Sequence, residues 1–167
     1  MKKEHLIISL ALAISLFIYV FYRTEHTVVN KIIISFFSND KFIELQGLIR
    51  KWLPLNEFTV YSLPEGLWVF CITLTSRHYY LKIRNIIINL FYLPLIFAVG
   101  LELLQLSHFT RGRFDIWDVF ASVLFWLCAI IGFSRRLELQ NIFKPLNTQS
   151  MVCLFSYVIV YLAHVWQ

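Results

Sequence analysis

Long apolar runs constrain this chain more than any other feature of its sequence. Each extends over roughly 17 to 22 residues, the length that an α-helix needs to cross about 30 Å of hydrocarbon at 1.5 Å per residue. Of the 167 residues, 59% are hydrophobic and 15% are charged, whereas apolar residues make up less than half of an average soluble domain. The sequence therefore predicts an all-α fold, a polytopic transmembrane helical bundle that forms a single integral membrane domain over residues 1–167.

We expect about five membrane spans in this domain. They cover residues 6–22, a segment from near 61 to the basic run that begins at 77, and residues 86–106, 116–133 and 151–166. The first span resembles a signal peptide because it follows Lys2 and Lys3. No small-residue cleavage site follows it, so we expect it to remain as a span. Pro94 predicts a kink in the third span, which helices in lipid tolerate.

A short amphipathic segment, residues 40–53, precedes the second span. Its large apolar side chains recur at helical spacing opposite Glu44 and Lys51, and they are Phe42, Leu45, Leu48, Ile49 and Trp52. Pro54 ends the segment. Because the segment is short and carries several charges, we expect an interfacial helix that lies along the membrane surface and does not cross it.

Basic residues between the spans predict the orientation of the chain. Residues 2–3, 77–84 and 135–144 are short stretches dense in Lys and Arg, whereas the long first loop is diluted by acidic residues. Cytoplasmic loops are enriched in Lys and Arg, so we expect the N-terminus inside and the C-terminus outside. The net charge of +5 is dispersed among the loops and forms no single stripe. The sequence therefore predicts no nucleic-acid partner.

The sequence lacks the usual motifs of metal, disulfide or hydrolytic chemistry. Cys71, Cys128 and Cys153 lie in separate apolar runs without C-x-x-C spacing. The histidines form no H-E-x-x-H pair, and none accompanies a nucleophile elbow. We therefore expect no metal, no cofactor and no catalytic residue, and we favour a protein that is not an enzyme.

The chemically informative residues lie in one stretch, GLELLQLSHFTRGRFDIWDVFASVLF. Two polar residues share one face of the third span near its end, and three share one face at the start of the fourth. A short loop with two arginines joins the spans, so we expect the polar faces to meet at one membrane surface. The candidate ligand-binding residues are Glu102, Gln105, Arg111, Arg113, Asp115, Asp118 and Ser122.

Two interpretations of this cluster remain open. In the structural one, Asp115 caps the fourth span, Asp118 is the acidic residue of its first turn, and Glu102 pairs with an arginine of the loop. In the functional one, the cluster recognises a polar headgroup or another ligand. Carboxylates within membrane spans are rare, and they usually have both partners and a purpose, so both interpretations predict convergence.

Three features of the stretch occur together: an acidic residue and a glutamine one turn apart (ELLQ), a loop with arginines, and R-F-D-I-W-D at the start of the next apolar helix. In this combination they resemble the signature of the VanZ-like family. That family contains small bacterial multi-pass membrane proteins and is named after an accessory determinant of resistance to the glycopeptide teicoplanin, with no general biochemical activity established. The resemblance covers about residues 86–133, with a fainter similarity in LPEGLW, and it marks Glu102, Gln105, Asp115 and Asp118, with Arg113 or Arg111 as the loop base.

The resemblance has two departures and leaves the function open. Ser122 stands where the family usually has Asn, and Phe125 stands where it has Gly. The resemblance implies a protein of the bacterial cytoplasmic membrane with a link to teicoplanin resistance. The arginines and carboxylates of the hairpin predict that it binds membrane lipids, a lipid-linked cell-wall precursor or a glycopeptide. The alternatives are a membrane enzyme or transporter that uses Glu102 and Asp118 as acid and base or as cation ligands, and a structural subunit with membrane protein partners.

Overall fold

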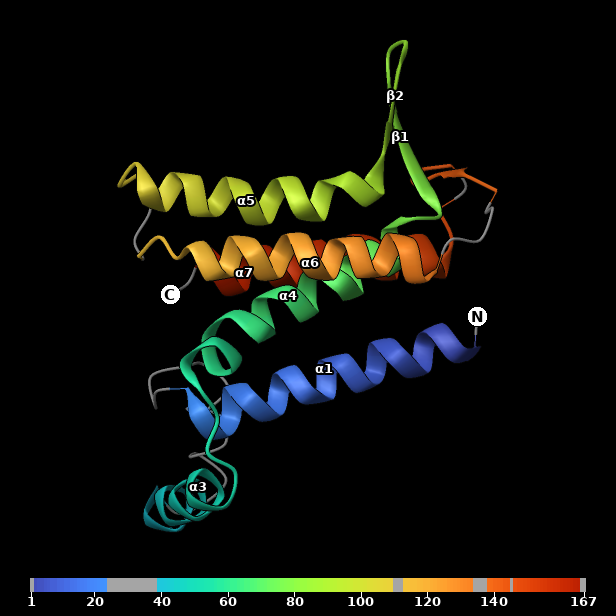
Figure 1. Cartoon of the computed structure of the whole chain (residues 1–167). Coiled ribbons are helices and arrows are strands. Elements are labelled where there is room, and N and C mark those ends of the chain that lie inside the picture. The colour runs from blue at the N-terminus through green and yellow to red at the C-terminus, as the bar shows by residue number, and fades with distance from the viewer. Residues whose placement is uncertain (1, 24–38, 110–112, 134–137, 145, 166–167) are drawn as a thin grey trace.

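The computed structural model describes residues 2–23, 39–109, 113–133, 138–144 and 146–165. This part of the chain is mostly helical (Figure 1). Its six α-helices are α1 (Lys2–Tyr22), α3 (Asn39–Trp52), α4 (Glu57–Ser76), α5 (Leu93–Leu106), α6 (Ile116–Gly132) and α7 (Thr148–Val165). A small sheet contains β1 (Tyr79–Ile83), β2 (Ile86–Asn89) and β3 (Gln140–Asn141), and the 3₁₀ turn η1 (Leu90–Tyr92) leads from β2 into α5.

Helix α4 is the centre of the bundle. It packs against α1, α5, α6 and α7, and it lies between α1 and α6 in Figure 1. Most of its residues are buried, and several are small: Ser62, Gly66, Cys71, Thr73 and Ser76. Small side chains let neighbouring helices approach closely. Asn56 caps the helix, since its side chain accepts a hydrogen bond from the Thr59 backbone N–H at 2.8 Å. The core therefore forms around α4.

Gly66 receives an aromatic ring from α6. A Cβ atom at this position would overlap the ring of Phe125, so the contact requires a residue without a side chain. The same ring packs edge-on against Phe70, with centroids 6.4 Å apart. Phe125, which stands where the VanZ-like signature has glycine, is thus accommodated by Gly66 on the facing helix.

Gly66→Ala is expected to be less stable than a matched alanine substitution elsewhere in the chain. Gly47→Ala is the control, because nothing lies within 4 Å of the added Cβ and alanine favours the helix. Overlap with Phe125 should make Gly66→Ala less favourable than Gly47→Ala by about 1 to 2 kcal/mol. Thermal unfolding in detergent measures the difference. Equal effects of the two substitutions would mean that the Phe125 ring moves aside without cost.

The three-stranded sheet corrects the predicted all-α fold. Strands β1 and β2 pair as an antiparallel hairpin, and β3 pairs in parallel with β1. The predicted third span, residues 86–106, is therefore wrong in its first part, since Ile86–Asn89 is a strand and α5 begins at Leu93. β-branched isoleucines suit an extended backbone. Pro94 causes no mid-helix kink because it lies in the first turn of α5, where its missing N–H is tolerated.

Two helices of the described residues are long and apolar enough to cross a membrane, Lys3–Tyr22 and Glu57–Ser76. Three further apolar helical stretches are shorter: Leu90–Leu106, Ile116–Gly132 and Thr148–Ile159. Each of the five predicted spans thus contains an apolar helix. The predicted amphipathic helix is also present, as α3.

Helix α3 is attached to the end of α1. The side chains of Gln46 and Arg50 donate hydrogen bonds of 2.7 Å to the carbonyls of Val20 and Phe21. These carbonyls belong to the last turn of α1, which has no helical partners for them and favours a positive charge. Helix α3 is seen end-on in Figure 1, so it crosses the direction of the bundle helices.

Candidate functional site

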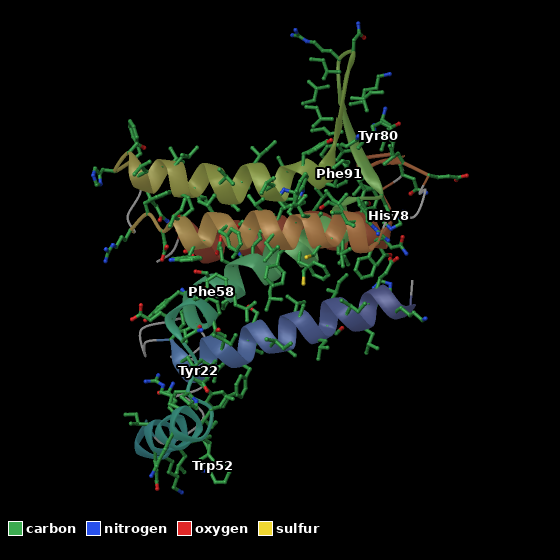
Figure 2. The ribbon with its side chains drawn as sticks, viewed as in Figure 1. Tyr22, Trp52, Phe58, His78, Tyr80 and Phe91 are labelled. Carbon is green, nitrogen blue, oxygen red and sulfur yellow. The ribbon has the colours of Figure 1, made fainter. Side chains whose placement is uncertain are left out.

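Four segments meet at one end of the bundle: the end of α1, the start of α4, the end of α5 and the start of α6 (Figure 1, left side). They bring together residues from four separate parts of the sequence. We call this set the polar cluster, and it consists of Arg23, Ser62, Glu65, Glu102, Asp115 and Asp118. Phe58 of α4 packs edge-on against Trp117 of α6 at the same end, with ring centroids 5.8 Å apart (Figure 2).

Glu102 joins α5 to α6. Its side chain is 7% exposed, and its Oε2 accepts a hydrogen bond of 3.0 Å from the backbone N–H of Asp115. Asp115 is the N-cap of α6, because its Oδ1 accepts from the Trp117 N–H at 2.9 Å. The predicted cap is therefore confirmed. The Glu102 carboxylate thus links α5 to α6 by accepting a charge-assisted hydrogen bond from a backbone N–H.

Asp118 has a different environment in the first turn of α6. It forms a side-chain hydrogen bond with Ser62 of α4, which is buried. Its other interactions are with the charges of Glu65, Asp115 and Arg23. Oδ1 of Asp118 is buried and has no hydrogen-bond partner in the described part of the chain. A buried carboxylate oxygen without a donor is costly, so this atom requires a donor beyond those that the described residues supply, such as water or a ligand.

Arg23 is the basic residue of the cluster. Its guanidinium lies 4.6 Å from the ring centroid of Tyr19 and 5.5 Å from that of Tyr61. It also donates a hydrogen bond of 3.1 Å to the Tyr61 carbonyl. The two rings hold the group at the junction of α1 and α4. Its Nε is buried and has no hydrogen-bond partner among the described residues.

One of the two loop arginines, Arg113, does not have the predicted role. Arg113 is exposed and forms no ion pair with Glu102 or Asp118 in the described ranges. Arg111 lies outside the described residues. Gln105 is half-buried at the end of α5, and Ser122 is buried one turn beyond Asp118. The structure thus brings Glu102, Asp115 and Asp118 together and adds Arg23 as a basic residue, while a role for Arg111 stays a prediction.

Three members of the cluster were not predicted from the sequence. Ser62 and Glu65 lie on α4, in and beside the motif LPEGLW, whose similarity to the family was noted without assigning a residue. Arg23 directly follows the first apolar run. A carboxylate inside an apolar segment is an independent signal of a site, and this signal could have identified Glu65. Arg23 gives no comparable signal, because basic residues are common at the ends of spans.

The cluster is rich in acid. Among the described residues, four carboxylates, those of Glu65, Glu102, Asp115 and Asp118, share it with the guanidinium of Arg23. Among the described residues no group of three or more His, Cys, Asp or Glu has the arrangement of a metal site. An acid-rich, partly buried cluster favours a polar ligand that carries hydroxyl or ammonium groups.

These features define a class: a small helical bundle with a central helix and an acid-rich polar cluster at one end. Comparisons with protein-family models, with characterised proteins and with solved structures give no match to this chain.

Proposed function

We propose that the chain is a VanZ-like integral membrane protein of the bacterial cytoplasmic membrane. In this proposal α1, α4, α5, α6 and α7 cross the bilayer, and the polar cluster binds the headgroup of an envelope lipid or a lipid-linked cell-wall precursor. It acts by binding and is not an enzyme. The link to teicoplanin resistance rests on the family resemblance alone.

The surface of the helices supports a membrane location. Large apolar side chains are exposed along α1, α5, α6 and α7, among them Leu10, Ile96, Leu124 and Phe155. Exposed apolar surface on this scale is unfavourable in water and favourable in lipid. Consecutive bundle helices run in alternate directions in Figure 1, as spans with short connections do. Two of the shorter stretches, Leu90–Leu106 and Ile116–Gly132, have 17 residues and reach about 25 Å, near the lower limit for a span.

Helix α3 fits the membrane surface in the same arrangement. It crosses the direction of the other helices, and Trp52 at its end is 87% exposed and points away from the bundle (Figure 2). Leu45 and Leu48 are also exposed. An interfacial helix buries such residues among lipid headgroups and acyl chains. With the N-terminus in the cytoplasm, α3 and the polar cluster lie at the outer surface.

Asp118 carries the proposal for a ligand. Glu102 and Asp115 have structural partners, whereas Oδ1 of Asp118 and Nε of Arg23 have none among the described residues. An acceptor and a donor in one cluster suit a headgroup with a hydroxyl or ammonium group beside a phosphate or carbonyl oxygen. The structural interpretation explains Glu102 and Asp115 but leaves these two atoms unexplained.

The enzyme and transporter alternatives have less support. Acid–base catalysis by Glu102 and Asp118 needs two carboxylates free to exchange protons with a substrate. Glu102 is instead bound to a backbone N–H that holds the hairpin together. Binding by Asp118 and Arg23 requires no such exchange, and it leaves the hydrogen bond between Glu102 and the Asp115 N–H intact.

Asp118→Asn is expected to reduce the amount of lipid ligand that co-purifies with the protein by about tenfold or more, the equivalent of 1.4 kcal/mol in binding. The substitution keeps the shape of the side chain but removes its charge and one acceptor. Mass spectrometry of lipids retained in mild detergent measures the loss. Asp115→Asn is the matched control, because Asn caps a helix as well as Asp does and should retain the ligand. Equal lipid retention by wild type and Asp118→Asn would contradict the proposed site.

A further inference from the structure

The β1–β2 hairpin has one face that is entirely apolar. Its cross-strand pairs are Tyr80 with Asn89, Leu81 with Ile88, Lys82 with Ile87, and Ile83 with Ile86. Side chains alternate between the faces of a strand, and directly paired residues share a face. One face therefore carries Leu81, Ile83, Ile86 and Ile88, and the other carries Tyr80, Lys82, Ile87 and Asn89.

The apolar face begins in the core and continues beyond it. Leu81 packs against the buried cluster of Tyr79, Leu90, Ile142 and Cys153. Ile83, Ile86 and Ile88 extend the same face and are exposed, Ile86 by 66%. The base of the hairpin is thus anchored in protein. Its outer half presents isoleucines that nothing in the described part of the chain covers.

Positive charge lies on the other face and at the tip. Lys82 is exposed on the face opposite Ile83 and Ile86. Arg84, in the turn, is also exposed and has φ 53°, so its backbone is left-handed. The hairpin contains no acidic residue. Its apolar face and basic residues therefore complement a surface of apolar chains beneath negative phosphates.

The direction of the hairpin is consistent with contact to the surface of a membrane. It projects sideways from the bundle, across the direction of α5 and α6, at the end opposite the polar cluster (Figure 1). The labelled Tyr80 and His78 mark its base at that end in Figure 2. If the helices cross the bilayer, an element that points across them at one end runs along the membrane surface.

We propose that the hairpin is a second lipid-contact site, which binds anionic phospholipids of the cytoplasmic leaflet. Ile83, Ile86 and Ile88 enter the boundary of the acyl chains, while Lys82 and Arg84 contact lipid phosphates. The inference rests on the proposed membrane location, but it does not depend on the polar cluster or its ligand. The protein then contacts both leaflets through elements parallel to the surface, α3 on one side and the hairpin on the other.

Two adjacent isoleucines of similar exposure allow a matched test. Ile86 lies on the apolar face and Ile87 on the opposite face, at 66% and 62% exposure. In a full-length chain whose native cysteines are replaced by alanine, each position is changed to Cys and labelled with an environment-sensitive fluorophore. The protein is reconstituted into phosphatidylcholine vesicles with or without about 30% phosphatidylglycerol. Spin-labelled lipids then quench any fluorophore that touches acyl chains.

We expect the label at Ile86→Cys to be quenched about threefold more than that at Ile87→Cys when phosphatidylglycerol is present. Combining Ile86→Cys with Lys82→Gln and Arg84→Asn should remove the dependence on phosphatidylglycerol. Asn is chosen at position 84 because it tolerates a left-handed backbone. Equal quenching at the two positions overturns the proposal. A label at Ile86→Cys that is shielded from water but not quenched by lipid also overturns it, in favour of a protein partner or a second copy of this chain.

Alkaline carbonate extraction of the same vesicles separates this inference from the proposed membrane location. Retention in the membrane with equal quenching at the two positions refutes the hairpin site alone. Release from the membrane refutes both the location and the hairpin site.

Discussion

Arg77→Ala is expected to lower the free energy of unfolding by about 1.5 to 3 kcal/mol, because it breaks a partly buried ion pair and removes a charged donor from its two acceptors. Arg77 Nη2 lies 2.6 Å from Glu4 Oε1, and the two side chains are only 9% and 18% exposed. The guanidinium also donates to the carbonyl of Phe133. One side chain thus joins the start of α1, the end of α4 and the end of α6, opposite the polar cluster.

Chemical or thermal unfolding in detergent measures this effect, and Arg113→Ala is the control because Arg113 is exposed. The pKa of the neighbouring His78 gives a second measurement of the change. Burial lowers the pKa of His78, and the positive charge of Arg77 lowers it further. Removing that charge should raise the pKa of His78 toward its ordinary value, which an NMR titration detects. A loss in stability no greater than that of Arg113→Ala would show that the pair contributes little.

Most of the helices could be predicted from the sequence, because apolar runs of membrane-spanning length form helices. The amphipathic spacing of Leu45 and Leu48 also predicted α3. The hairpin was missed because Ile86–Asn89 continues without a break into the apolar run of α5, and length alone assigned it to a span. The alternation in YYLKI and the β-branched run that follows Arg84 and Asn85 were the available signals.

The polar cluster could be predicted only where it depends on local spacing. Asp115 and Asp118 lie on one helix, and the short loop brings Glu102 next to them, so three carboxylates were found from sequence. The participation of Arg23 and Ser62 depends on how α1 and α4 pack against α6, and no spacing within one segment encodes that packing. Distance along the chain favours the loop arginines as partners of the carboxylates, but Arg113 is exposed, and Arg111 lies outside the described residues.

Substitutions of Glu102, which joins α5 to α6, and of Asp118, which is proposed to bind the ligand, should have different effects on stability and lipid binding. Glu102→Ala is expected to lower the free energy of unfolding by about 1.5 to 3 kcal/mol, because it removes a charged acceptor and leaves the Asp115 N–H without its partner. Glu102→Gln should cost less, since the amide oxygen still accepts, although more weakly than a carboxylate. Gln105→Ala, on the same helix one turn away, is the control and should be close to neutral.

Asp118→Asn should have the opposite pattern. It removes a charge whose Oδ1 is buried without a hydrogen-bond partner in the described part of the chain, so the ligand-free protein should keep or gain stability. Lipid retention should fall nevertheless. Thermal melts of delipidated protein, set beside lipid retention for the same variants, distinguish the two roles. If Asp118→Asn destabilises the protein as much as Glu102→Ala does and leaves lipid content unchanged, the whole cluster is structural, and the proposed ligand site must lie elsewhere.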